Sequence, residues 1–220
     1  FDLPMKSGLS GATFRTMVDK SARKMEKNLG YGRSFFLDNF DIPDAVTIDG
    51  KANYGYVAAA FSKLSFIPVI GLNRSPAHNL AVFQGRADGL NYSSRVAVRL
   101  VDDDFNDFEL VEDDLSDLIG QALDALEDCT LIIDCRVCLN ADPGAVANRI
   151  YEFLAAAEAK FPFAEIIVTG SSLPASIGQV AKTTQESELA RVELQIFDTL
   201  RGLGGMGHVG LGDYTVVSPL

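Results

Sequence analysis

The chain has few of the residues that build disulfide frameworks and most metal centres. It contains three cysteines and two histidines in 220 residues. Cys129, Cys135 and Cys138 lie close together in sequence, which suits reduced thiols better than a disulfide framework. The Cys135-x-x-Cys138 spacing is that of half a zinc site, but no second pair follows, and His78 and His208 are far away in sequence. We therefore expect no metal and no cofactor, and we interpret Cys135 and Cys138 as small side chains packed where a strand meets a loop.

Basic residues are also scarce. Lysine and arginine total 19 against 30 aspartates and glutamates, giving a net charge of −11. Nucleic-acid binding depends on clustered cations that release counterions, so this balance argues against a general phosphate-backbone binder. A local basic pocket remains compatible with it.

Long apolar runs are absent as well. No stretch of about 18 uninterrupted apolar residues occurs, and no charged and then apolar leader opens the chain, so neither a membrane span nor a secretory signal is supported. With 47% hydrophobic residues, the chain can still bury a large core. We expect a globular protein located in the cytoplasm.

Short β-branched or aliphatic runs recur at nearly even spacing, each followed by a helix-patterned stretch. These runs are Phe35–Leu37, Ile67–Ile70, Val96–Leu100, Leu131–Ile133, Ile166–Val168 and Val209–Leu211. Strands separated by crossover helices must run parallel, so the rhythm predicts an α/β fold, an incomplete (β/α)8 TIM-like barrel. No composition shift divides residues 1–220, which we assign to a single domain. Phe1-Asp2-Leu3-Pro4 is patterned like the end of a strand, so we expect the N-terminal strand to be missing and the chain to be a fragment of a longer protein.

Helix boundaries are signalled by caps and prolines. Ser10 is placed to cap a helix that Gly30 ends, and Ser75-Pro76 and Asp142-Pro143 are start signals. The other predicted helices are Tyr54–Leu64, one that begins near Asp113 or Asp114, and a last one that carries Leu189 to Leu200.

Alternation along the strands predicts which polar side chains enter the barrel. If Val96, Val98 and Leu100 face the surrounding helices, Arg99 points inward near the carboxyl end of its strand, where barrel enzymes carry their active sites. The same rule places Asp38, Asp134 and Arg136 at this mouth. A lone charge there would be costly, so we expect Arg99 to pair with Asp134 or Asp38. Such pairing alone would be structural; the functional alternative is that Arg99 and Arg136 hold an anionic or carbonyl-bearing ligand while a carboxylate acts as base or metal ligand.

Two later segments complete the predicted mouth. Thr169, Ser171 and Ser172 lie on a loop where barrels often bind phosphate, although the serines could instead cap a helix beginning at Pro174. Asp213 and Tyr214 follow the last strand. The predicted catalytic residues are Asp38, Arg99, Asp134 and Asp213, and the predicted ligand-binding residues are Arg136, Thr169, Ser171, Ser172 and Tyr214.

Several segments together resemble the beta family protein, a group found in phages and bacteria. They are Phe36-Leu37-Asp38, Ile67 to Leu72, Val96 to Leu100, Ile132-Ile133-Asp134, Thr169 to Pro174 and Gly212-Asp213-Tyr214. Members of that family are longer at both ends. The resemblance implies no established activity and no catalytic assignment, but its setting in phages and mobile elements implies a role in genome conflict or defence.

Three functions follow as hypotheses. The first is a polar ligand site at the barrel mouth, hydrolase- or lyase-like, acting on a small anionic compound. The second is a non-catalytic interaction module in phage–host conflict, in which the acidic surface or the loops contact a protein partner. The third is a metal-dependent phosphodiesterase using Asp38, Asp134 and Asp213, which the neighbouring arginines disfavour because they would repel a cation.

Overall fold

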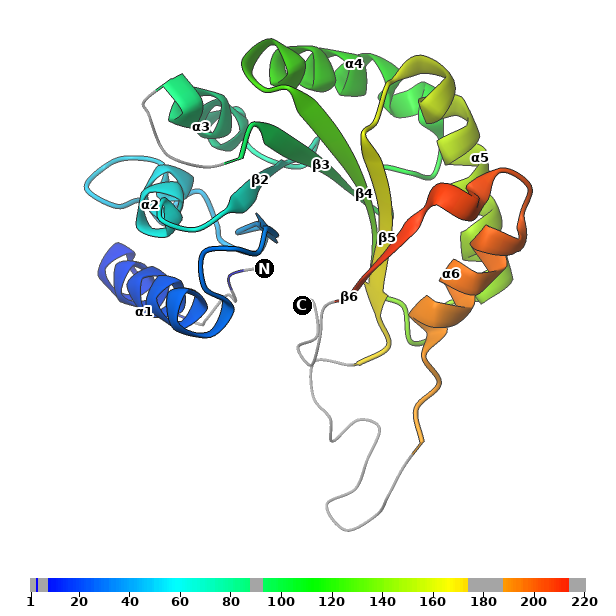
Figure 1. Cartoon of the computed structure of the whole chain (residues 1–220), viewed down its shortest axis with the longest axis horizontal. Coiled ribbons are helices and arrows are strands. Elements are labelled where there is room, and N and C mark those ends of the chain that lie inside the picture. The colour runs from blue at the N-terminus through cyan, green and yellow to red at the C-terminus, as the bar shows by residue number, and fades with distance from the viewer. Residues whose placement is uncertain (1–2, 4–7, 88–92, 174–187, 214–220) are drawn as a thin grey trace. The chain divides into compact units, whose positions relative to one another are not determined.

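The computed structural model describes residues 3, 8–87, 93–173 and 188–213, and its strands alternate with helices along the chain (Figure 1). The strands are β1 (Phe35–Leu37), β2 (Phe66–Ile70), β3 (Arg95–Val101), β4 (Asp128–Val137), β5 (Glu165–Ser171) and β6 (Gly210–Asp213). The helices are α1 (Gly11–Leu29), α2 (Asn53–Phe61), α3 (Pro76–Ala87), α4 (Phe108–Ala125), α5 (Pro143–Lys160), α6 (Val192–Gly202) and the 3-10 helix η2 (Met206–His208). The strand order is β1-β2-β3-β4-β5-β6. This mixed α/β architecture confirms the six predicted strands and their alternation with helices.

The described chain forms two compact units. The first comprises residues 1–98 and 117–129, and the second comprises residues 99–116 and 130–220. We describe each unit by itself. The assignment of residues 1–220 to one domain stays a prediction.

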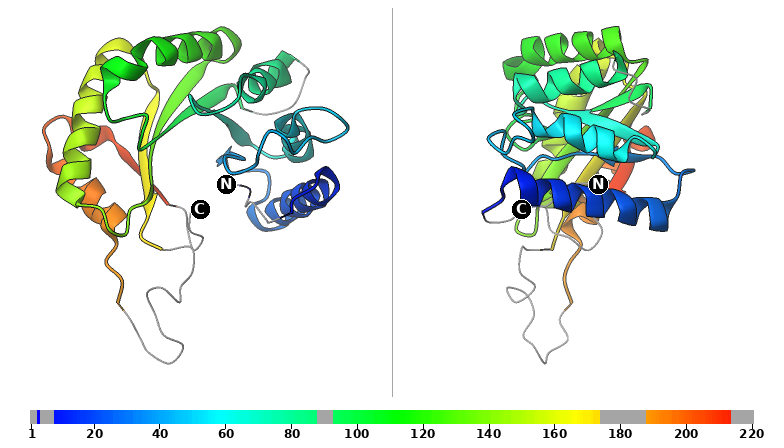
Figure 2. Two further views of the ribbon diagram at one scale, coloured as in Figure 1. Left: turned by 180° about the vertical axis from the view of Figure 1, so that it is seen from behind. Right: turned by 90° about the vertical axis from the view of Figure 1, so that its left-hand side faces the viewer.

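The first unit contains a parallel arrangement of β1, β2 and the beginning of β3. Phe35 lies opposite Phe66 in the β1–β2 register, and Val69 lies opposite Ala97 in the β2–β3 register. Helices α1, α2 and α3 lie side by side, as the right-hand view of Figure 2 shows. Their apolar faces supply a core that includes the fully buried Phe61.

The second unit is built on β4, β5 and β6, which also pair in parallel. Leu131 lies opposite Ile166, and Val168 lies opposite Leu211. Helices α5 and α6 pack against each other. The Phe108 ring at the start of α4 meets the Phe153 ring of α5 edge to face, with 5.6 Å between ring centroids.

The predicted start and stop signals of the helices are confirmed at several positions. Ser10 accepts a hydrogen bond from the Thr13 N–H in a capping box, and Gly30 ends the helix with a φ of 73°, which glycine adopts readily. Asp142 accepts from the Ala145 N–H and precedes a proline at the first position of α5. Local capping chemistry therefore fixes these boundaries.

The last predicted helix does not carry Leu189, because α6 begins at Val192. Two further helix boundaries were predicted wrongly. Helix α4 begins at Phe108, several residues before Asp113, because the Asp107 carboxylate accepts the Glu109 N–H at 3.0 Å and so opens the helix earlier. Helix α2 ends at Phe61 rather than Leu64, and the Leu64 N–H turns back to the Phe61 carbonyl at 2.8 Å. Both ends are decided by short-range hydrogen bonds that apolar periodicity does not report.

Some of the sequence predictions concern residues outside the described part of the chain. Most of Phe1-Asp2-Leu3-Pro4 and any helix after Pro174 lie outside the described residues. Leu3 itself is buried, and its N–H donates to the Asp38 carbonyl at 3.2 Å. Among the described residues, none of the helices combines the length and the apolar character that crossing a bilayer requires.

Candidate functional site

Arg99 and Asp134 form a buried ion pair in the second unit. Arg99 Nε donates to Asp134 Oδ2 at 2.7 Å, and Nη2 donates to the same oxygen at 2.5 Å. The Arg99 side chain is 5% exposed and that of Asp134 is 0% exposed. The predicted pairing of Arg99 is confirmed, and its partner is Asp134.

The second oxygen of Asp134 accepts a hydrogen bond from Arg136, a residue with an unusual backbone conformation. The Arg136 N–H donates to Asp134 Oδ1 at 2.8 Å. Arg136 has a φ of 49°, in the left-handed region that non-glycine residues rarely adopt, and the β4–β5 register shifts between Asp134 and Val137. Strand β4 therefore ends in a bulge that turns the chain, and such bulges re-aim side chains next to functional sites.

Thr169 lies on β5, the strand beside this ion pair. Thr169 and Ser171 were predicted wrongly to lie on a loop, because β5 continues to Ser171. Thr169 is directly opposite Asp134 in the parallel β4–β5 register, so both side chains are on the same face of the sheet. Gly212 is opposite Thr169 on β6, and a Cβ at Gly212 would come within 3.2 Å of the Thr169 Cβ. The absence of a side chain at Gly212 leaves that space to Thr169.

Ser171 and Ser172 are engaged inside the second unit. Ser171 Oγ accepts the Leu173 N–H at 3.1 Å, which forms a local turn. Ser172 Oγ accepts the Val192 N–H at 2.7 Å, so it caps the first turn of α6, and it donates to the Glu193 carboxylate. The helix that these serines were expected to cap, beginning at Pro174, lies outside the described residues, and the helix that Ser172 caps starts 20 residues further along the chain.

Glu193 is a buried carboxylate that the sequence analysis did not identify. Burial by itself would raise its pKa, but the hydrogen bonds from Ser172 and Arg191, the Glu193 backbone and the charge of Arg191 together outweigh burial and lower the pKa. Glu193 is thus held ionised at the base of α6. A glutamate at the second position of a helix is a recognisable signal, because its charge favours the helix N-terminus.

The last strand carries Asp213 at its end. Asp213 is opposite Gly170 in the β5–β6 register, so its backbone lies at the carboxyl ends of the strands as predicted. The structure describes nothing of its side chain, and Tyr214 lies outside the described residues.

Asp38 forms a second buried ion pair, in the first unit. Arg74 Nη2 donates to Asp38 Oδ2 at 2.6 Å, and the Asn39 N–H donates to Asp38 Oδ1 at 2.8 Å. The Arg74 guanidinium lies over the Phe40 ring, 4.2 Å from its centroid. The sequence analysis did not identify Arg74, which lies in the loop after β2. The alternation of β2 gives no guide there, because all five of its residues are buried.

The three cysteines are free thiols packed in the interior. Burial raises the pKa of Cys129 to about 12 and also raises the pKa of both Cys135 and Cys138. A Cβ at Gly170 would lie 3.2 Å from Cys135 Cβ and 3.3 Å from Cys138 Sγ. This supports the packing interpretation, because buried thiols with raised pKa values are poor nucleophiles.

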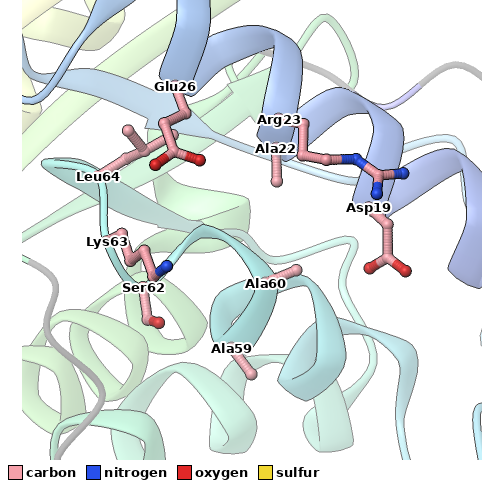
Figure 3. Close-up of a pocket in the computed structure, with 9 residues that line it drawn as sticks. All are labelled: Asp19, Ala22, Arg23, Glu26, Ala59, Ala60, Ser62, Lys63 and Leu64. Atoms are coloured by element: carbon pink, nitrogen blue, oxygen red, sulfur yellow. The ribbon is translucent and has the colours of Figure 1, made fainter.

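A surface hollow lies elsewhere in the first unit, between α1 and the end of α2 (Figure 3). Its volume is about 250 Å³. Ala22, Ala59 and Ala60 line it together with opposite charges such as Glu26 and Lys63. It lies apart from the predicted site residues Asp38, Asp134 and Arg99 in sequence, and it contains none of them.

The chemistry available at these clusters is that of charge recognition. Within the described part of the chain, no group of three or more His, Cys, Asp or Glu side chains is placed to hold a metal ion. Both oxygens of Asp134 accept hydrogen bonds, so this carboxylate anchors Arg99 and the Arg136 backbone. Arg136 and Thr169 adjoin this anchor and are only partly buried.

Comparison with known proteins identifies the family and nothing further. No curated protein matches the chain, and no solved structure matches it. A sequence profile described as Beta protein matches residues 1–220, which is the whole chain. The chain therefore belongs to the Beta protein family.

Proposed function

We propose that the chain binds a small anionic compound at a site in the second unit formed by Arg99, Asp134 and Arg136, with Thr169 beside them. The observation that carries the proposal is the buried ion pair between Arg99 and Asp134, whose carboxylate also holds the Arg136 backbone. Arginine suits carboxylate and phosphate anions because its planar guanidinium donates in a fork.

Stability alone gives a weak reason for this arrangement. Replacing a buried ion pair by apolar residues of similar volume is often neutral or stabilising, because desolvation offsets the attraction between the charges. The left-handed conformation of Arg136 adds about 1–2 kcal/mol of backbone strain. Strain and buried charge at one place are typical of functional sites.

The roles of the residues differ within the proposed site. Asp134 fixes the Arg99 guanidinium, and the bulge presents the Arg136 side chain to the ligand. The Thr169 hydroxyl supplies a neutral donor on the same face as Asp134. We propose a hydrolase- or lyase-like reaction, which is measured as turnover of the bound anion.

The fold supports the location of the site. We propose that the six parallel strands belong to an eight-stranded (β/α) barrel, in which the carboxyl ends of the strands carry the active site. Arg99, Asp134 and Thr169 all lie in the second half of their strands.

Substitution of Arg136 tests the proposal. Arg136→Gly removes the guanidinium, and glycine adopts the positive φ without strain. The free energy of unfolding of this variant should therefore lie within about 1 kcal/mol of that of the wild type. Its affinity for an anion should fall at least about tenfold, since a charge-assisted hydrogen bond contributes about 1.5–3 kcal/mol. The probes are inorganic phosphate, pyrophosphate and succinate, titrated calorimetrically against the full chain.

A control variant makes the result specific. Arg201→Gln removes an exposed arginine on α6 and should leave anion binding unchanged. Equal affinities of the wild type and Arg136→Gly for all three anions would contradict the proposed site.

A second candidate function is a protein-interaction module, which the distribution of charge favours. Residues 102–128 contain twelve carboxylates and no lysine or arginine, so the rest of the chain is close to neutral. Exposed members include Asp113, Asp114 and Asp117 on α4, and Leu110 at the start of that helix is 80% exposed. Such a surface suits a basic partner.

Charge reversal distinguishes the two functions. The triple variant Asp113→Lys, Asp114→Lys and Asp117→Lys should abolish a stoichiometric protein complex if the module is the function, whereas Arg136→Gly should leave the complex intact. Loss of anion turnover in Arg136→Gly, with no effect of the triple variant, would favour the ligand site.

A further inference from the structure

The surface hollow between α1 and the end of α2, which takes no part in the proposed anion site, is lined by charges of both signs. Asp19, Arg23 and Glu26 lie on one face of α1, because residues three and four positions apart adjoin on a helix. Lys63 lines the hollow from the end of α2 (Figure 3). Two cations and two carboxylates therefore surround the hollow, and their formal charges cancel.

The hollow also has an apolar floor, formed by Ala22, Ala60 and Leu64. Ala22 and Leu64 are buried, and Ala60 is partly buried. The volume of about 250 Å³ is the space of roughly eight water molecules, since each takes up about 30 Å³ of the liquid. A compound with about eight non-hydrogen atoms therefore fits, and part of its surface can be apolar.

Each carboxylate of the hollow uses only one of its two oxygens. The Tyr56 hydroxyl donates to Asp19 Oδ1 at 2.7 Å, and the Tyr31 hydroxyl donates to Glu26 Oε1. In the part of the chain that the structure describes, the second oxygen of each carboxylate accepts no hydrogen bond from a side chain. The hollow therefore offers two free carboxylate oxygens as acceptors.

The two cations of the hollow are free as well. Neither Arg23 nor Lys63 has a hydrogen-bond or ion-pair partner among the described residues. In the view of Figure 3, Asp19 and Arg23 lie at one end of the hollow, and Glu26 and Lys63 lie at the other. A simple anion would meet the carboxylates as well as the cations, and a simple cation would meet the same conflict. A compound that carries both charges complements the whole lining.

We propose that this hollow binds a zwitterionic amino acid with a small apolar side chain. The cations of the hollow hold the carboxylate of the amino acid, and the free carboxylate oxygens accept hydrogen bonds from its ammonium group. Its side chain packs on the apolar floor. This site differs in residues and in ligand class from the anion site proposed in the second unit, so the two proposals are independent.

Three probes of nearly the same shape test the proposal. L-valine carries both charges, 3-methylbutanoate lacks the ammonium group, and isobutylamine lacks the carboxylate. The full chain is labelled with 15N and titrated with each probe, and the resonances of α1 and α2 are followed by NMR. L-valine should bind about tenfold more tightly than either analogue, because each analogue loses the contacts of one charge and is repelled by the groups that held it.

Variants of exposed cations locate the site. Arg23→Gln and Lys63→Gln should each weaken the binding of L-valine by about three- to fivefold, the effect of losing one exposed ion pair. Lys24→Gln is the matched control, because Lys24 is a neighbouring exposed cation of α1 that does not line the hollow. This control should retain the wild-type affinity. All three side chains are exposed, so the thermal unfolding midpoints of the variants should match that of the wild type.

Three outcomes would overturn the proposal. Equal affinities for L-valine and 3-methylbutanoate would show that the hollow recognises only negative charge. Equal weakening by Arg23→Gln and Lys24→Gln would show that binding depends on the overall charge of α1 and not on the hollow. The third outcome is a titration in which L-valine shifts no resonance of α1 or α2. None of these results bears on the anion site, which has its own variants and probes.

Discussion

The two units each contain a buried arginine–aspartate pair, and the two pairs are built differently. In the second unit, Arg99 lies within β3 and Asp134 within β4, and two nitrogens of Arg99 donate to one oxygen of Asp134. In the first unit, Asp38 follows β1 and Arg74 comes from the loop after β2, with one nitrogen donating at 2.6 Å. Both carboxylates use their other oxygen to accept a nearby backbone N–H.

The two pairs differ in how tightly the backbone constrains them. A pair carried by two strands is positioned by the ladder of the sheet, so neither partner can move away from the other. A pair that includes a loop arginine can relax, and Arg74 has the Phe40 ring as an additional support. We therefore expect the strand-borne pair to respond more strongly to substitution.

The largest effect should follow removal of Arg99. Arg99→Met removes the guanidinium that donates to Asp134, whose side chain is 0% exposed. Removing one partner of a buried pair lowers the free energy of unfolding by about 3–5 kcal/mol. Urea denaturation followed by circular dichroism measures this loss. A loss below about 1 kcal/mol would show that Asp134 is readily solvated or neutralised.

Removal of Arg74 should cause a smaller loss of stability than removal of Arg99. Arg74→Met removes a partner that comes from a loop rather than from a strand, and Asp38 still accepts the Asn39 N–H. The loss should therefore be about 2–3 kcal/mol, smaller than for Arg99→Met. The two variants are compared under identical conditions. The reverse order of stability would contradict the distinction between strand-borne and loop-borne pairs.

Two glycines extend the comparison to packing. A Cβ at Gly170 in the second unit would lie 3.2–3.4 Å from atoms of Cys135, Cys138 and Glu193. Gly170→Ala should therefore lower the free energy of unfolding by about 1–3 kcal/mol. Gly120 lies inside α4 with nothing within 4 Å of an added Cβ. Gly120→Ala should therefore raise the free energy of unfolding by about 0.5–1 kcal/mol. Thermal unfolding of both variants checks the opposite signs.

Acid should weaken the first unit before the second. Burial lowers the pKa of His78, which packs on Tyr54 and faces Arg74, Asp38 and Asp44, below its ordinary value of 6.5. The neutral form is favoured in the folded state, so this contribution to stability is complete above pH 6.5 and is lost as the pH falls below it. One proton changes stability by at most about 1.4 kcal/mol per pH unit.

The stability of the second unit depends on pH over a lower range, through Glu193. The lowered pKa of Glu193 gives stability that is complete above pH 4.5 and is lost as the pH falls through the folded value. Hydrogen exchange between pH 7 and 5 should show protection falling in β2 and α3, and His78→Gln should remove this dependence. Equal losses of protection in β2 and β5 over that range would count against the assignment.

The strands and the strand-borne pair were predictable from the sequence because both depend on a period of two. Val96, Val98 and Leu100 alternate with Arg99, and this pattern placed Arg99 and Asp134 where they could meet. The Arg74 pair could not be predicted, because loop geometry carries no periodicity. The capping of α6 by Ser172 likewise depends on a hydrogen bond between distant segments. The bulge at Arg136 depends on a left-handed backbone conformation that the apolar pattern does not report.

The double variant Arg99→Met with Asp134→Leu distinguishes a functional ion pair from a structural one, since it removes both charges of the pair together. Its free energy of unfolding and its affinity for phosphate, pyrophosphate and succinate are measured together. We predict stability equal to or above that of the wild type, with anion binding lost. A variant that is destabilised by several kcal/mol yet binds the anions as the wild type does would show that the pair is structural and that the proposed site is elsewhere.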